Sequence, residues 1–224
     1  MLTFLALLPC VLLMIYIYKK DKVEKEPIRL LILVFIAGII STIPAMIFED
    51  IGDGILLCLF NENSVTYAAL SMIVVALVEE IVKFFAAKTI WKKPDFNCLF
   101  DGIVYCVFAA LGFAALENVL YVLDGGIGIA LVRGVISVPS HACDGIVMGY
   151  FFGWAKLFEN RGDIARSKRY RRLAVLVPAA EHFIFDFCLT ISVSMLLWLA
   201  FVIAFDIIAF LIVKKTAEND RYIV

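Results

Sequence analysis

Long apolar stretches, separated by short polar segments, make up most of this chain. A membrane-spanning helix needs about 17–25 mostly apolar residues, and six stretches reach that length. The last stretch is too long for one crossing and is best divided near Ser192 or Ser194. The pattern therefore predicts an all-α, polytopic transmembrane bundle of about seven helices. The apolar stretches lie at residues 2–18, 28–48, 65–90, 98–123, 127–155 and 173–213.

Composition supports this class of protein. Of the 224 residues, 63% are hydrophobic and 18% charged, with a mean hydropathy of +0.98, which is far from the composition of soluble globular domains. No internal repeat, flexible linker or low-complexity run divides the chain. We therefore expect one integral membrane domain over residues 1–224, with its functional core helices within about 65–192. The apolar run 55–60 could lie at the interface or re-enter the membrane, and the sequence leaves both open.

Basic residues predict the orientation. Eighteen of the 20 Lys and Arg residues flank alternate gaps between the apolar stretches or lie in the tail, and the intervening gaps contain none. By the positive-inside rule, the N-terminus lies outside and the C-terminus in the cytoplasm of a cell membrane. The run 159–172 is interpreted as a solvated charge run facing lipid headgroups, and no nucleic-acid partner is expected.

Ionisable residues within the apolar stretches are the candidates for function, because a charge at bilayer depth costs about 2.5–3.5 kcal/mol on insertion scales. In the stretch 65–90, Lys83 follows Glu79 by four residues and Glu80 by three, so both carboxylates can share its ammonium on one helix face. Two adjacent carboxylates in an apolar site cannot easily both stay ionised. One of them is therefore suited to general acid/base work while the other is held charged by Lys83.

Both histidines of the chain also fall inside apolar stretches, His141 in 127–155 and His182 in 173–213. His182 and Asp186 are four residues apart and share a helix face. Pro139 and Pro178 lie close before the two histidines, and a proline frees a backbone carbonyl and can kink its helix. The sequence predicts a widened cavity where water reaches the imidazoles.

The stretch 98–123 adds a carboxylate and an amide, Glu117 and Asn118. Counting a rise of about 1.5 Å per residue puts the buried acids and histidines at compatible depths, with Glu117 the nearest to the outer face. From Arg133 to Gly153, every fourth residue is polar or small. The glycines of this series predict a groove that lets another helix approach closely.

These groups are suited to activating water. His141, His182 and a carboxylate could hold Zn²⁺ and leave a fourth position for water. Without a metal, Glu79 or Glu80 could act as general base with a histidine as acid. The absence of H-E-x-x-H and of Gly-x-Ser-x-Gly argues against zincin and serine-nucleophile chemistry. Each group alone could be a structural ion pair or a hydrogen-bonded bundle residue, but their conjunction on four successive helices favours an active site.

The pattern resembles the PrsW family of bacterial intramembrane proteases, which is related to the CAAX-prenyl endopeptidases. The resemblance covers the third to the sixth predicted helix. It rests on four groups in order, Glu79-Glu80-x-x-Lys83, Phe113-x-x-x-Glu117-Asn118, His141 followed by Gly149, and His182-x-x-x-Asp186.

The resemblance implies a multi-pass membrane endopeptidase that makes the site-1 cut in a single-pass anti-sigma factor. That cut starts the release of an extracytoplasmic-function sigma factor under envelope stress. The resemblance does not decide between a metal-dependent and a glutamic mechanism. The implied roles are Glu79 and Glu80 as the water-activating pair, His182 as their essential partner, His141, His182, Glu117 and Asp186 as metal ligands, and Lys83 and Asn118 as supporting groups.

A proton- or cation-coupled transporter or channel is the main alternative, since buried Glu, Asp and His side chains also form relays. The absence of an inverted repeat and of paired broken helices argues against it. A non-catalytic scaffold is a third interpretation, which the retention of all four groups disfavours.

Overall fold

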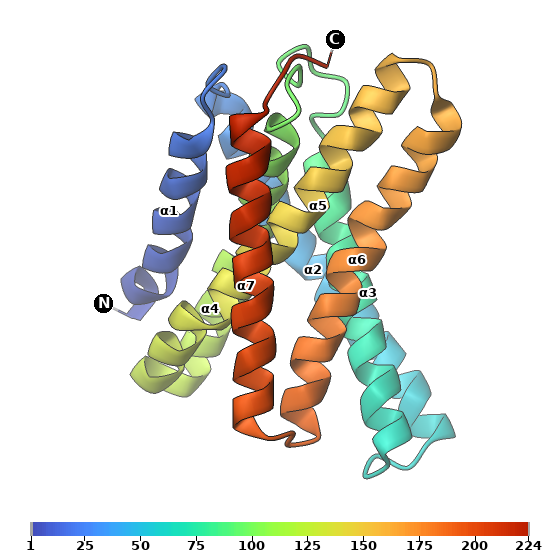
Figure 1. Cartoon of the computed structure of the whole chain (residues 1–224). Helices are drawn as coiled ribbons and strands as arrows, with labels where there is room; N and C mark the ends of the chain where they lie inside the picture. Colours follow the sequence, from blue (N-terminus) through green and yellow to red (C-terminus); the bar gives the residue numbers. More distant parts are fainter. Residues whose placement is uncertain (1, 224) are drawn as a thin grey trace.

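The computed structural model describes residues 2–223, and within them it is helical with no β-sheet (Figure 1). The predicted all-α fold is confirmed, with seven helices in the described part of the chain. The helices are α1 Leu2–Lys20, α2 Ile28–Leu59, α3 Val65–Lys88, α4 Asp101–Val135, α5 Ser137–Asn160, α6 Ile164–Thr190 and α7 Met195–Glu218.

Six helical segments in this range are long and apolar enough to cross a membrane, with α4 and α5 counted as one segment. The gaps after α1, α3 and α5 and the C-terminal tail lie at one end of the bundle (Figure 1). These are the segments that carry or adjoin the basic residues, so we call this the basic end. The gaps after α2 and α6 meet at the opposite end, called the outer end here because the positive-inside rule assigns the basic end to the cytoplasm.

Helix α4 is the centre of the bundle and packs against α1, α2 and α5. Glycines allow these helices to approach closely. A Cβ added at Gly149 of α5 would lie 2.4 Å from the Cα of Ile103, and one added at Gly38 of α2 would lie 2.1 Å from the carbonyl oxygen of Ala109. The predicted close helix approach along the α5 glycines is confirmed, and α4 is the helix that uses it.

Helix α2 is longer than predicted and continues to Leu59. The segment 49–60, expected to be an acidic loop followed by an apolar run, forms its last turns, so the run 55–60 does not re-enter the bundle. No proline interrupts this segment, and the first strong break is the polar gap before Ser64. The Ser64 hydroxyl accepts the backbone N–H of Tyr67 at 3.1 Å and begins α3.

The boundary between α4 and α5 differs from the prediction. The chain breaks its helical path at Gly126, which has φ +71°, and then continues helically to Val135. Glycine tolerates this left-handed conformation. Helix α5 begins only at Ser137, so Pro139 lies in its first turn, where its missing N–H removes no helical hydrogen bond. The predicted kink at Pro139 is therefore wrong, and His141 lies near the start of α5 and not in the middle of a helix spanning 127–155.

Helix α6 also begins earlier than predicted, at Ile164, so most of the run 159–172 is helical. Asp163 caps this helix by accepting the backbone N–H of Arg166 at 3.0 Å. Pro178 lies inside α6, one turn before His182, as the sequence predicted.

Candidate active site

Helix α3 carries a lysine shared by two carboxylates. Lys83 Nζ donates to Glu79 Oε2 and to Glu80 Oε1, each at 2.8 Å, and the side chains of Lys83 and Glu80 have no exposed area. Spacings of three and four residues put both acids on the face of the lysine. The predicted sharing of one ammonium by two acids is present in the structure. Burying three charges in an apolar bundle is tolerable because each has an opposite charge in contact.

Lys83 Nζ also lies 3.0 Å from His141 Nδ1 on α5. An ammonium has no lone pair, so His141 Nδ1 must accept this hydrogen bond. The ring proton of a neutral His141 is then on Nε2, which lies 2.9 Å from Glu117 Oε2 of α4. The α3 lysine thereby fixes the tautomer and the orientation of the α5 histidine.

Glu117 has a second partner, since Arg133 Nη2 lies 2.9 Å from the same carboxylate oxygen. Arg133 Nε donates to Asn118 Oδ1 at 3.1 Å, and Asn118 Nδ2 donates to the carbonyl of Ala6 in α1 at 2.7 Å. Glu117, the acid predicted to be nearest the outer face, is therefore connected to the buried lysine through His141. Asn118 anchors this network to α1.

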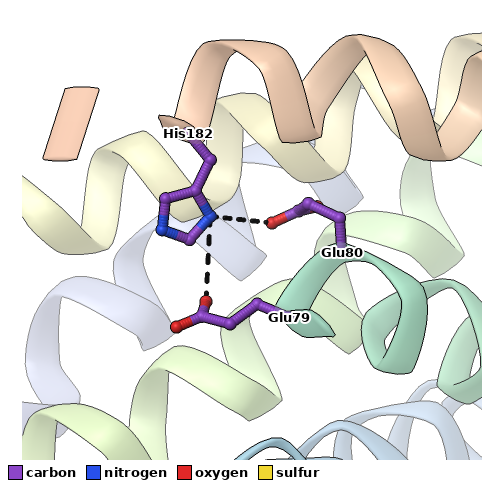
Figure 2. A group of neighbouring side chains, drawn as sticks. All are labelled: Glu79, Glu80 and His182. Carbon is purple, nitrogen blue, oxygen red and sulfur yellow. Dashed lines mark hydrogen bonds and ion pairs between the residues drawn. The ribbon is translucent and has the colours of Figure 1, made fainter. Parts of the chain in front are cut away.

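His182 of α6 reaches the α3 acids from the other side. Its Nδ1 lies 3.2 Å from Glu80 Oε1 and 3.8 Å from Glu79 Oε2, so the ring points between the two carboxylates (Figure 2). Its Nε2 lies 3.2 Å from Asp186 Oδ2. The ring centroids of His182 and His141 are 5.6 Å apart. Four helices, α3 to α6, thus contribute to one continuous polar cluster.

A cavity of about 840 Å³ lies against this cluster. Glu79 and His182 line it, whereas Glu80 and Lys83 are not part of its wall. The lining continues to Asp50, which is exposed on the outer half of α2, and to Thr190, which is exposed at the outer end of α6. Water and an extended chain can therefore reach Glu79 and His182, while Glu80 and Lys83 support them from behind. The further predicted site residues in the wall are His141, Glu117 and Asp186.

Asp144 of α5 also lines the cavity but was not among the predicted site residues. It is 1% exposed, lies beside Glu181 of α6, and its Oδ1 has no hydrogen-bond partner in the described part of the chain. Glu49, at the outer half of α2, lines the cavity too. An acid within an apolar helix is the signal that could have identified Asp144. The predicted end of the second helix at residue 48 placed Glu49 in a loop.

The donor atoms at the α3–α6 contact are compatible with a metal ion. One ligand atom each from Glu79, Glu80 and His182 lies within 4.8 Å of the others. Glu80 Oε2 is buried without a hydrogen-bond partner among residues 2–223, so it is free to bind an ion. One imidazole nitrogen and two carboxylates, beside a cavity that admits water, are a donor set that Zn²⁺ takes in catalytic sites.

The predicted metal ligands are distributed differently around this contact. Only His182 belongs to the group of three, and Asp186 lies behind it on Nε2, where a carboxylate orients a histidine ligand. His141 and Glu117 are bonded to each other, with Lys83 and Arg133 as their further partners.

Comparison with known families matches residues 26–213 to the family described as PrsW family intramembrane metalloprotease. This chain belongs to the PrsW family. The match runs from just before α2 into the last part of α7, so it contains every helix of the polar cluster.

Individual relatives of this chain support the same family assignment. Protease PrsW of Oceanobacillus iheyensis is 38% identical over 94% of this chain and 94% of its own length. Protease PrsW of Clostridioides difficile is 35% identical over 85% of this chain and 80% of its own. Protease PrsW of Bacillus subtilis is 29% identical over 95% of this chain and 92% of its own length. No solved structure matches the chain.

The PrsW-family chain is therefore a membrane protease, embedded as a multi-pass protein in the bacterial cell membrane and acting on membrane proteins. The family's description as metalloproteases agrees with the donor set formed by Glu79, Glu80 and His182.

Proposed function

We propose that this PrsW-family protease makes the site-1 cut in a single-pass membrane anti-sigma factor. The cut would start the release of an extracytoplasmic-function sigma factor under envelope stress. The observation that carries the proposal is the group Glu79, Glu80 and His182 beside a cavity that extends to the outer end of the bundle.

The position of the cavity suits this substrate. Its lining reaches Asp50 on the outer half of α2 and Thr190 at the outer end of α6, and the gaps after these two helices carry no Lys or Arg. A stress signal that arises in the envelope has to reach the protease or its substrate on the outer side of the membrane. An extended segment of a single-pass protein entering from there would reach Glu79 and His182 but not Glu80 and Lys83, which are behind the wall.

Glu79 is the residue that we assign to proton transfer from the attacking water. Its Oε2 is held by Lys83, while its Oε1 makes no hydrogen bond to any described residue and so remains available to water. In a mechanism without a metal, His182 at the same wall is the group that would protonate the leaving amine. Proton transfer by positioned side chains contributes roughly 10²–10⁴-fold to rate.

We further propose that Glu79, Glu80 and His182 hold Zn²⁺. When bound, the metal supplies polarisation of the scissile carbonyl and acidification of water. Asp186 accepts a hydrogen bond from His182 Nε2 and keeps Nδ1 directed at the two glutamates. Lys83 holds the glutamate pair in place through its two hydrogen bonds.

Cleavage of a co-expressed anti-sigma factor tests the proposed function. The variants Glu79→Gln, Glu80→Gln and His182→Asn should leave the protein inserted and abundant but lower cleavage by roughly 10²-fold or more. Glu62→Gln, an exposed acid just before α3, is the matched control and should cleave normally. Cleavage at the wild-type rate in the three variants would refute the assignment of these residues.

Metal analysis tests the Zn²⁺ proposal separately. Purified wild-type protein should contain about one Zn²⁺ per chain when three ligands hold it, and His182→Asn should lose it. A chelator-treated, metal-free protein that cleaves at the untreated rate would overturn the metal proposal and leave the proton-transfer roles of Glu79 and His182 in place.

A further inference from the structure

The basic end of the bundle holds a second group of buried acids, remote in sequence from the α3 acids. Asp21 follows α1, Glu26 precedes α2, and Asp101 is the first residue of α4. One carboxylate oxygen from each lies within 4.8 Å of the others, and all three residues are at most 3% exposed. This basic-end acid group is brought together by one loop and a helix start, and no part of the proposed proteolysis uses it.

Two members of the group are held in position by donors. Asp101 Oδ2 accepts the backbone N–H groups of Asn97 at 2.9 Å and Cys98 at 2.6 Å, while its Oδ1 has no partner among the described residues. Glu26 accepts a hydrogen bond from the Tyr105 hydroxyl, one turn further along α4. These contacts fix both carboxylates and still leave oxygen atoms directed into the group.

Asp21 is the member that lacks any partner. It is 1% exposed, and neither of its carboxylate oxygens has a hydrogen-bond partner within residues 2–223. Lys25 lies close but donates to the backbone carbonyls of Tyr18 and Asp21 instead of to a carboxylate. A buried carboxylate with both oxygens free is costly unless something else binds it.

No Lys or Arg side chain forms an ion pair with the group. In the described part of the chain, no basic nitrogen lies within 4 Å of the carboxylates of Asp21, Glu26 or Asp101. The negative charge of these carboxylates is therefore not neutralised by an ion pair within the protein, and a bound cation would neutralise it.

The C-terminal tail closes over the same region. Phe100 N donates to Asp220 Oδ1 at 2.9 Å, Leu99 N to the carbonyl of Arg221 at 3.0 Å, and Ile223 N to that of Asn97 at 2.7 Å. The gap after α1, the start of α4 and the tail therefore meet at the basic-end acid group. A ligand bound there would join two segments that are far apart in the sequence, beside the point where the tail packs.

We propose that Asp21, Glu26 and Asp101 bind a hard divalent cation, Mg²⁺ or Ca²⁺, at the basic end of the bundle. Both ions prefer oxygen ligands, and the site offers carboxylates from three residues with no histidine among them. The cation would supply the positive charge that the surrounding side chains do not provide. It would stabilise the cytoplasmic side of the fold and is independent of the proposed cleavage chemistry.

Thermal unfolding of chelator-treated protein in detergent tests the site. Adding MgCl₂ or CaCl₂ should raise the Tm of the wild type by a saturable shift of roughly 5 °C, while KCl of equal ionic strength should not. Asp21→Asn should abolish the shift and should itself unfold at a higher temperature than the wild type when no divalent cation is present, because it removes an uncompensated charge.

Three matched variants complete the test. Glu24→Gln, an exposed acid in the same loop, and Glu79→Gln, in the candidate active site, should both keep the shift. Glu26→Gln should lose it, and it replaces Asp21→Asn if that variant fails to fold. A shift that persists in both Asp21→Asn and Glu26→Gln, a shift lost only in Glu79→Gln, or no saturable shift in the wild type would each overturn the proposal. Counting bound Mn²⁺ by electron paramagnetic resonance gives a second readout, with one site fewer expected in Asp21→Asn.

Discussion

The two groups of buried acids in this protein differ in what lies next to their negative charges. In the candidate active site, Glu79 and Glu80 share Lys83, so one ammonium contacts both acids, and His182 faces them from α6. In the basic-end acid group, Asp21 and Glu26 have no basic side chain within 4 Å in the described part of the chain.

The difference shows how the location of an acid determines its partner. A charged side chain in the middle of a membrane helix needs an oppositely charged side chain on the same or a neighbouring helix, since ions from solution reach it only through a cavity. A group at the end of the bundle is close to the cytoplasm and can take a cation from solution. The α3 acids therefore have a counter-charge in Lys83 even without a metal, whereas the basic-end acid group is proposed to obtain its only counter-charge from a bound cation.

Removing Lys83 should have the largest effect on stability. Lys83→Met leaves Glu79 and Glu80 buried without their shared ammonium, and breaking a buried pair in this way costs about 3–5 kcal/mol. Adding Glu80→Gln should recover part of the loss, because one uncompensated acid is then removed. Unfolding of the chelator-treated protein in detergent measures both.

Lys88→Met is the matched control, since Lys88 is exposed on the same helix. It should change the free energy of unfolding by less than about 0.5 kcal/mol. Equal stability of Lys83→Met and Lys88→Met would show that the active-site acids are not held by the lysine.

Neutralising one acid of the paired group should have an intermediate effect. Glu80→Gln removes a charged acceptor from both Lys83 and His182, and we expect the free energy of unfolding to fall by about 1–3 kcal/mol in metal-free protein. The same detergent unfolding assay measures it. A gain in stability would contradict the assignment of Glu80 as a paired charge.

Neutralising one acid of the unpaired group should have the smallest effect and the opposite sign. Without divalent cations, Asp21→Asn should raise the free energy of unfolding by about 0.5–1 kcal/mol, because it removes a buried charge without a partner. With saturating Mg²⁺ or Ca²⁺ the order should reverse. If Asp21→Asn and Glu80→Gln shift stability in the same direction without cations, the contrast between the two groups is wrong.

Local sequence patterns were enough to predict the α3 part of the site. The spacing of Glu79, Glu80 and Lys83 fixes their contact, because residues three and four apart share a helix face. His182 and Asp186 met for the same reason. The helix ends around the site were harder to predict, because apolar periodicity does not show where a long helix breaks. The pattern predicts a loop over residues 124–126 between two full crossings, whereas the chain only breaks its helical path at Gly126 and α4 continues to Val135.

The sequence by itself determined the all-α membrane fold, the number of long helices and the ionisable residues that lie within them. Hydrophobic length and helix periodicity are local properties, so they can be derived without the fold. Only the tertiary structure decided which of those residues meet. His141 pairs with Lys83 and Glu117, while His182 joins the two glutamates, because helix crossings such as the close approach at Gly149 set the register between helices. The basic-end acid group was likewise invisible in the sequence, because Asp21, Glu26 and Asp101 converge only where the loop after α1 and the start of α4 pack together.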